Sequence, residues 1–270
     1  MDRIVFESVR KSFRHRPALF NWLGRERGGE TIALKDVSFS AKRAEVLALL
    51  GPNGSGKTTA LKLISTMLLP DAGSVRVGGC DARHDAGAVR PQVGIAVATE
   101  RSFFPRLSAR ENLEFFAALD EVPRGERAHR IHEVLLDTGL EEQADKLVMK
   151  FSSGMYQRLG IARALVKRPS VLLLDEPTRS LDAATTAHFW ATIRALARQQ
   201  TTVLLATHNF AEAAAVADRL LLLHRGELLA DRPVGGQSGE ALRAFYFQMT
   251  GEIDEAVAGF GKALPSLSSP

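Results

Sequence analysis

The sequence has very little cysteine. Its one cysteine, Cys80, has no second cysteine with which to form an internal disulfide. Structural disulfides belong to oxidising compartments, so this composition fits a chain that works in a reducing cytoplasm. Cys80 itself is expected to be a small core side chain.

Apolar runs long enough to cross a membrane are also absent. The longest aliphatic runs are VLALL, VLLL and LLLL, at residues 46–50, 171–174 and 220–223. A membrane-spanning helix needs about 20 apolar residues, and the N-terminal segment lacks the apolar stretch of a signal peptide. Any function within a membrane would therefore need another polypeptide.

Neither repeats nor an extreme charge balance mark a special class of protein. The 270 residues carry a net charge of +4, with 24% charged and 45% apolar residues, which is an ordinary globular balance. No internal repeat is visible, so one functional unit is expected. The modest charge gives no reason to expect nucleic acid as a partner.

The apolar pattern predicts an α/β fold. Continuous apolar runs are typical of strands buried on both faces of a parallel sheet, and they occur at residues 46–51, 171–175 and 202–207. Helical patterns cover residues 108–120, 126–138, 155–167 and 184–199. The last of these lies between two of the strands and would form a right-handed crossover.

Shorter signals add detail to this pattern. Residues 3–9 and 74–79 are expected to be strands, and residues 220–230 a final hairpin. Ser108 followed three residues later by Glu111 predicts a capping box at the start of a helix.

A glycine-rich segment, GPNGSGKT at residues 51–58, fits the phosphate-binding pattern G-x-x-x-x-G-K-[ST]. It leaves a buried strand and enters a helix, so its backbone N–H groups point at one anion. Lys57 adds charge at the β- and γ-phosphates, and the Thr58 hydroxyl can ligate Mg²⁺. The expected ATP-binding residues here are Gly51, Pro52, Asn53, Gly54, Ser55, Gly56, Lys57, Thr58 and Thr59.

Two carboxylates and a histidine follow buried strands further along the chain. Asp175 and Glu176 end the run VLLLDE, and their side chains point differently because strand side chains alternate. Asp175 is expected to hold Mg²⁺, while Glu176 polarises the attacking water. His208 follows the next strand and would contact the γ-phosphate. Glu176, His208 and Lys57 are therefore the expected catalytic residues, with ATP and Mg²⁺ as cofactors.

These motifs, in this order, resemble the ABC transporter ATPase family over roughly residues 3–250. The matching pieces are residues 51–58, FSSGMYQRLGIARAL at 151–165, VLLLDEP at 171–177, RSLD at 179–182 and ATHN at 206–209. The resemblance implies an α/β fold with a P-loop NTPase core and a mixed, mainly parallel sheet. It also implies an N-terminal antiparallel β subdomain and an inserted α-helical subdomain at about residues 100–167. Residues 1–250 would form a single nucleotide-binding domain, and residues 251–270 a flexible tail.

Further site residues follow from the resemblance alone. The family signature Leu-Ser-Gly-Gly-Gln reads FSSGM here, at residues 151–155. Ser152 and Gly154 keep their places, which implies contact with the γ-phosphate bound to the opposite subunit. Phe13 would stack on adenine. Asp182 would order the loop that crosses the dimer interface.

The sequence departs from the family where a metal-linking glutamine is expected. Counting back from Ser108 places Thr99 there, and counting forward from Gly94 places Ala98 there. Gln92 comes too early. Either Glu100 supplies the Mg²⁺ oxygen instead, or the usual link is missing.

The resemblance implies the ATP-binding and ATP-hydrolysing subunit of an exporter of the ABC-2 class. Such a subunit would pair head to tail with a second copy of itself. It would dock on a separate membrane permease at the cytoplasmic face of the cell membrane. The cargo stays open. Residues 100–119 and 207–229 are similar to drug and lipid exporter ATPases, while the insertion at residues 14–31 and the Ser-Ser-Gly-Met signature are similar to ATPases of polysaccharide and lipid-linked glycan exporters.

Two questions stay open at this point. The basic insertion at residues 14–31 is either a solvated loop or a contact with anionic lipid or with the partner. The alternative function is a soluble ABC ATPase acting on a non-transport target. Ribosome-acting members usually carry two nucleotide units, and DNA-repair members need a long coiled coil, which this chain lacks.

Overall fold

The computed structural model describes residues 2–14, 29–97 and 102–252, and its core is a six-stranded sheet. The strand order is β10-β9-β3-β8-β7-β6, in which β9 through β6 run parallel and β10 pairs antiparallel with β9. The strands are β3 (Val46–Leu50), β6 (Val93–Val97), β7 (Val171–Asp175), β8 (Thr202–Thr207), β9 (Arg219–His224) and β10 (Glu227–Pro233). The predicted α/β class and the final hairpin are confirmed.

The continuous apolar runs are explained by burial on both faces of this sheet. Every residue of β3, β7 and β8 is buried. Side chains alternate along β7, so Leu172 and Leu174 join one hydrophobic core while Val171 and Leu173 join another. The sheet therefore separates these two cores, and a third, smaller core includes Ala48 and Leu50 of β3.

The first core lies between the six-stranded sheet and a second, antiparallel sheet, with helix α1 (Lys57–Ile64) between them. That sheet has the order β2-β1-β4-β5, with β1 (Asp2–Arg14), β2 (Glu30–Lys42), β4 (Ala72–Val77) and β5 (Cys80–Asp81). Strand β1 extends well beyond the predicted residues 3–9. Strand β4 ends earlier than predicted, because Gly78 and Gly79 turn the chain at positive φ.

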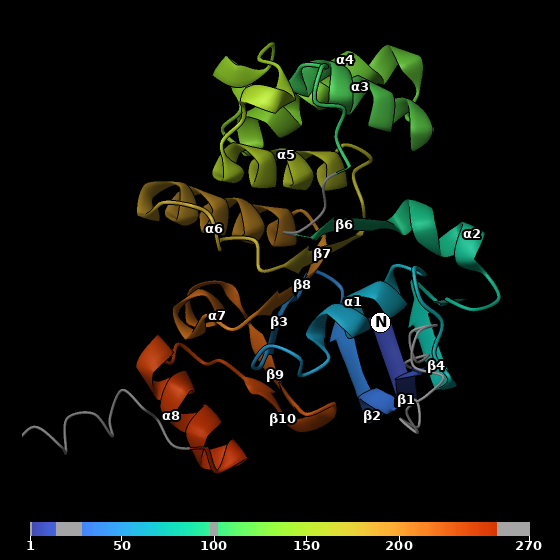
Figure 1. Cartoon of the computed structure of the whole chain (residues 1–270), viewed down its shortest axis with the longest axis vertical. Coiled ribbons are helices and arrows are strands. Elements are labelled where there is room, and N and C mark those ends of the chain that lie inside the picture. The colour runs from blue at the N-terminus through green and yellow to red at the C-terminus, as the bar shows by residue number, and fades with distance from the viewer. Residues whose placement is uncertain (1, 15–28, 98–101, 253–270) are drawn as a thin grey trace, which may run out of the picture.

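The second core is covered by helices, which occupy the upper part of Figure 1. They are α3 (Ala109–Leu119), α4 (Arg124–Asp137), α5 (Ser153–Leu165) and α6 (Ala183–Arg198). The capping box is confirmed: the Ser108 side chain accepts from Glu111 N, and a Glu111 carboxylate oxygen accepts from Ser108 N at 2.7 Å. Helix α6 joins the neighbouring parallel strands β7 and β8, as the crossover prediction required.

The remaining elements are short or lie at the edges. They are helices α2 (Ala86–Val89), α7 (Phe210–Val216) and α8 (Gly239–Thr250), and the 3-10 turns η1 (Arg90–Gln92), η2 (Glu141–Gln143) and η3 (Val148–Lys150). Cys80 is half-buried against the first core, not fully inside it. Among the described residues, no helix combines the length and apolarity needed to cross a bilayer.

Several predictions concern residues that the structure does not describe. The alternatives at Ala98, Thr99 and Glu100 lie outside the described residues, and so does Glu100 as a metal ligand. The same holds for residues 15–28 of the basic insertion and for residues 253–270 of the tail.

Candidate functional site

The phosphate-binding segment joins the carboxyl end of β3 to the first residue of α1. Its glycines are required by close contacts. A Cβ on Gly51 would lie 2.1 Å from the Leu223 carbonyl oxygen, and Gly56 combines a φ of 111° with a clash against the Ala33 carbonyl oxygen. Gly56 also begins α1 without any side-chain cap, so the first backbone N–H groups of that helix are available to an anion.

Lys57 brings a buried positive charge into this loop. Its Nζ donates to the Gly51 carbonyl at 2.7 Å and to the Pro52 carbonyl at 3.0 Å. Burial lowers the pKa of Lys57. The nearby Ser55 hydroxyl is buried and has no hydrogen-bond partner among the described residues. A phosphate group in the loop would offer acceptors to both side chains.

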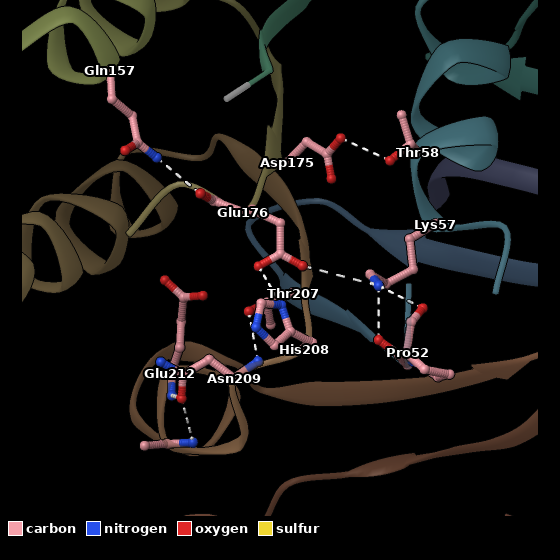
Figure 2. Close-up of polar contacts among 12 residues, drawn as sticks. Pro52, Lys57, Thr58, Gln157, Asp175, Glu176, Thr207, His208, Asn209 and Glu212 are labelled. Atoms are coloured by element: carbon pink, nitrogen blue, oxygen red, sulfur yellow. Dashed lines mark hydrogen bonds and ion pairs between the residues drawn. The ribbon is translucent and has the colours of Figure 1, made fainter. Parts of the chain in front are cut away.

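Two oxygen ligands suited to a divalent cation meet beside the loop. The Thr58 hydroxyl donates to Oδ2 of Asp175 at 2.8 Å, and burial raises the pKa of Asp175 (Figure 2). Hydroxyl and carboxylate oxygens are hard ligands that suit Mg²⁺. In the described part of the chain no three His, Cys, Asp or Glu side chains gather as a metal cage.

Glu176 follows β7 in an unusual backbone conformation, with a φ of 50°. Oε2 of its carboxylate lies 2.7 Å from His208 Nδ1, and Oε1 lies 4.0 Å from Lys57 Nζ. Oε1 is buried and has no hydrogen bond within the described residues. One carboxylate oxygen is therefore held while the other remains able to accept a proton from water.

A hollow of about 430 Å³ lies in front of these groups. The predicted residues that line it are Asn53, Gly54, Gly56, Lys57, Thr58, Thr59, Asp175 and Glu176. It is also lined by Thr31, Lys62 and Arg179, which were not among the expected site residues. Loop, metal ligands and carboxylate thus open into one space at the carboxyl edge of the parallel strands, where such sheets place their ligands.

Phe13 lies beside this hollow, not in its wall. It stands on β1 opposite Thr31, which does line the hollow, and its ring is 37% exposed. Lys11 Nζ lies 5.7 Å from the ring centroid. An exposed aromatic face at the edge of the hollow is available to a flat base.

The other residues taken from the family resemblance lie apart from this hollow. Ser152 caps α5, with its hydroxyl accepting from Met155 N at 3.3 Å. Asp182 caps α6, and the hydrogen bond from Thr185 N lowers the pKa of its carboxylate. Neither these two residues nor Gly154 line the hollow of their own chain.

Sequence reasoning missed two polar residues behind Glu176. Gln157, in α5, donates from Nε2 to the Glu176 carbonyl at 2.8 Å. Glu212, in α7, is only 1% exposed, accepts from Trp190 Nε1, and has a pKa raised by burial. The one available signal was Asn209 three residues before Glu212, which reads as an ordinary helix cap and gives no hint of burial.

A loop with the phosphate-binding sequence pattern, a hydroxyl–carboxylate pair suited to Mg²⁺ and a neighbouring carboxylate, at the edge of a buried parallel sheet, are the features of a P-loop ATPase. Residues 34–179, more than half of the chain, match the family model described as ABC transporter. The chain belongs to this family and is an ATPase.

Individual relatives agree with this membership. The chain is 36% identical over 197 residues to the ABC transporter ATP-binding protein NatA of Bacillus subtilis, covering 73% of this chain and 80% of NatA. It is 35% identical to the linearmycin resistance ATP-binding protein LnrL of Bacillus subtilis, covering 75% of this chain but 65% of LnrL. A solved dimer of the ATP-binding cassette MJ0796, bound to ADP and phosphate after hydrolysis, matches with a TM-score of 0.75 and 26% identity, covering 87% of this chain and 100% of that one.

Proposed function

We propose that this chain is the ATP-binding and ATP-hydrolysing subunit of an ABC exporter, and that it powers a separate membrane permease. The observation that carries this proposal is the Glu176 carboxylate, held by His208 and facing the phosphate loop near Lys57. Such an arrangement suits transfer of a terminal phosphate to water. Residues 1–250 would act as one nucleotide-binding domain, with a helical subdomain at about residues 100–167 and a tail at residues 251–270.

The proposed chemistry assigns one task to each side chain. The loop N–H groups and Lys57 bind the β- and γ-phosphates, while Thr58 and Asp175 hold Mg²⁺, which neutralises phosphate charge when bound. Glu176 Oε1 accepts a proton from the attacking water as the water oxygen bonds to the γ-phosphorus, while the bond from that phosphorus to the bridging oxygen breaks and ADP leaves. His208 holds the other oxygen and so keeps the carboxylate aimed at that water.

We propose that the active form is a head-to-tail dimer of this chain. Ser152 and Gly154 begin α5 outside the hollow of their own chain, with Ser152 exposed to solvent. A helix start with free N–H groups favours an anion, and the γ-phosphate of a second copy would supply one. The description of MJ0796 as dimeric supports a dimer.

An exposed apolar patch offers a docking surface for the permease. It consists of Phe104, Phe115, Leu119 and Met149, each with between 44% and 67% of its surface exposed. Phe104 and Phe115 stack edge to face at 4.8 Å, and Leu119 lies one helical turn beyond Phe115 on the same face of α3. Contiguous exposed apolar surface marks interaction sites. We therefore place the membrane partner on this apolar patch, which puts the chain at the cytoplasmic face of the membrane.

The names of the relatives favour an exporter subunit over a soluble ABC ATPase. NatA is named as a transporter protein and LnrL as a resistance protein. A resistance role suits removal of a drug-like compound, so a drug-like cargo is favoured over a polysaccharide. Nucleic acid is not expected as a partner.

Co-purification tests the proposal. The chain is expressed with its candidate permease, and ATP turnover is measured with and without that partner in lipid nanodiscs. We expect the complex to co-purify and turnover to change on assembly. Phe104→Asp should abolish co-purification while ATP binding is kept. Leu136→Asp, an equally exposed apolar residue on α4, is the matched control. Full turnover with no membrane partner that binds would favour the soluble alternative.

A further inference from the structure

Gln157 connects the start of helix α5 to the backbone of Glu176. Its Nε2 donates to the Glu176 carbonyl at 2.8 Å, and its Oε1 accepts from Ser180 N at 3.3 Å. Figure 2 shows the amide reaching from α5 to the residue that ends β7. Both polar ends of this one side chain are therefore used, and both partners belong to the segment that runs from β7 to α6.

We propose that Gln157 is a positioning residue that fixes the carboxylate of Glu176 by holding the carbonyl of that same residue. This rests on the proposed role of Glu176 as the base. It extends that role by naming what keeps the base in place.

The Glu176 backbone needs such support. A φ of 50° lies in the left-handed region, which residues with a Cβ adopt at an energetic cost and keep only when their surroundings hold them. The N–H of Glu176 donates to the Ala206 carbonyl at 2.9 Å, which anchors one side of the residue to β8. Gln157 anchors the other side: its Nε2 donates to the carbonyl at 2.8 Å, which is shorter than the 3.3 Å hydrogen bond that the Arg179 N–H makes to the same oxygen.

Loss of that second anchor would move the carboxylate. The direction of the Cα–Cβ bond follows from the backbone angles on both sides of Glu176. If the Gln157 hydrogen bond is lost, only the longer bond from the Arg179 N–H restrains the carbonyl, so ψ can relax and the side chain can swing away from His208 Nδ1, now 2.7 Å from Oε2. A displacement of about 1 Å at a reacting group can cost about 10²-fold in rate.

Gln157 also lies near the start of α5, which is the segment that we propose contacts the nucleotide of the partner subunit. Gln157 lies just over one turn after Ser152, the cap of α5. Between them, Gly154 approaches the loop before α6 so closely that a Cβ there would lie 2.9 Å from the Ser180 carbonyl oxygen. A shift of the start of α5 would therefore be transmitted through Gln157 to Glu176 of the same chain. This couples occupancy of one site in the dimer to the geometry of the other.

Helix α5 does not depend on Gln157 for its packing. Its apolar face is formed by other side chains, including the fully buried Leu159 and Ala162. Gln157 itself is only half-buried. Its replacement is therefore expected to leave the fold intact and to act on catalysis.

Two substitutions and a control test the proposal in the reconstituted complex. Gln157→Leu removes both hydrogen bonds at similar volume. Gln157→Glu keeps an acceptor for Ser180 N but removes the donor to the Glu176 carbonyl. Gln199→Leu, at an exposed position after α6, is the control. We expect kcat to fall about 10- to 100-fold in both Gln157 variants. The Kd for ATP should stay within about twofold, because that side chain does not line the hollow.

A double mutant separates positioning from a general structural effect. In the Glu176→Gln background, Gln157→Leu should cause no further loss of kcat, because both changes act on the same group. Additive losses, or wild-type kcat in both Gln157 variants, would overturn the inference. If Gln157→Leu lowers Tm, its kcat is set aside and the kcat of the Gln157→Glu variant tests the inference. Wild-type turnover in Glu176→Gln alone would instead overturn the proposed base itself, and the two failures are therefore distinguishable.

Discussion

His208 Nδ1 lies 2.7 Å from Glu176 Oε2, so the histidine directly holds the carboxylate that we propose as the catalytic base. The sequence had suggested a contact between His208 and the γ-phosphate. The two roles are compatible, because the second ring nitrogen, Nε2, is not engaged by any described residue and the side chain is 56% exposed. His208 can therefore bridge the base and the phosphate.

Glu176→Gln should leave ATP binding intact and lower hydrolysis by ~10²–10⁴, the usual scale for loss of a general base. Glutamine can keep the contact to His208 but cannot accept the proton. Single-turnover hydrolysis and nucleotide binding measure the two effects separately. ATP should also trap the variant as a dimer in size-exclusion chromatography. Near wild-type turnover would rule out Glu176 as the base.

Lys57→Ala should weaken ATP binding strongly, because a buried ammonium aimed at the phosphate loop is lost. Isothermal titration with ATP is the measurement. Lys42→Ala, at an exposed position on β2, is the control and should bind as the wild type does. An unchanged Kd in Lys57→Ala would mean that residues 51–58 are not the phosphate cradle.

Mixed dimers test whether the two chains share their sites. Lys57→Ala breaks the phosphate loop, and Gly154→Asp breaks the start of α5. A mixed dimer then has one site with both halves intact, so its activity should exceed that of either mutant homodimer. Rescue is expected to be partial, since coupling between the sites can require both. If mixing the variants in the reconstituted complex restores nothing, each chain completes its own site. Tm measurements must accompany the Gly154 variant, because its Cβ meets the Ser180 carbonyl oxygen.

Phe13→Ala should raise the Kd for ATP without changing kcat. Stacking of a base on an aromatic ring is worth about 1–3 kcal/mol, which corresponds to roughly 5- to 150-fold in affinity. Phe13→Trp keeps an aromatic face and should bind ATP as tightly as the wild type. Equal affinities for the alanine and tryptophan variants would remove Phe13 from the adenine site.

Glu212→Gln should stabilise the protein more at high pH than at low pH. Burial raises the pKa of Glu212 above its unfolded value, so the folded chain keeps this proton to higher pH. As pH rises from the unfolded pKa through the folded one, the wild type loses stability that the glutamine variant keeps. The Tm difference, variant minus wild type, should therefore be larger near about pH 8 than near about pH 5. Glu240→Gln, at an exposed position in α8, should show no such trend, and a flat Tm difference for Glu212→Gln would contradict the prediction.

The features that could be predicted from the sequence are those encoded by residues close to one another in the chain. The phosphate loop is contiguous, and its function depends on a strand, a turn and a helix that follow one another. The capping box at Ser108 and the all-apolar strands β3, β7 and β8 are likewise encoded by neighbouring residues. Each was therefore readable from spacing alone.

Tertiary structure decided how separate segments meet. Glu176 and His208 follow the ends of β7 and β8, and Lys57 begins α1 after the loop that leaves β3. These residues come together because the three strands are adjacent and parallel. Gln157 gave no signal, because a glutamine on a helix is usually a solvated residue. Its role depends on α5 lying against the loop after β7, a contact set by core packing. Periodicity reports which face of an element is buried but not which element covers it, so such contacts appear only in the folded chain.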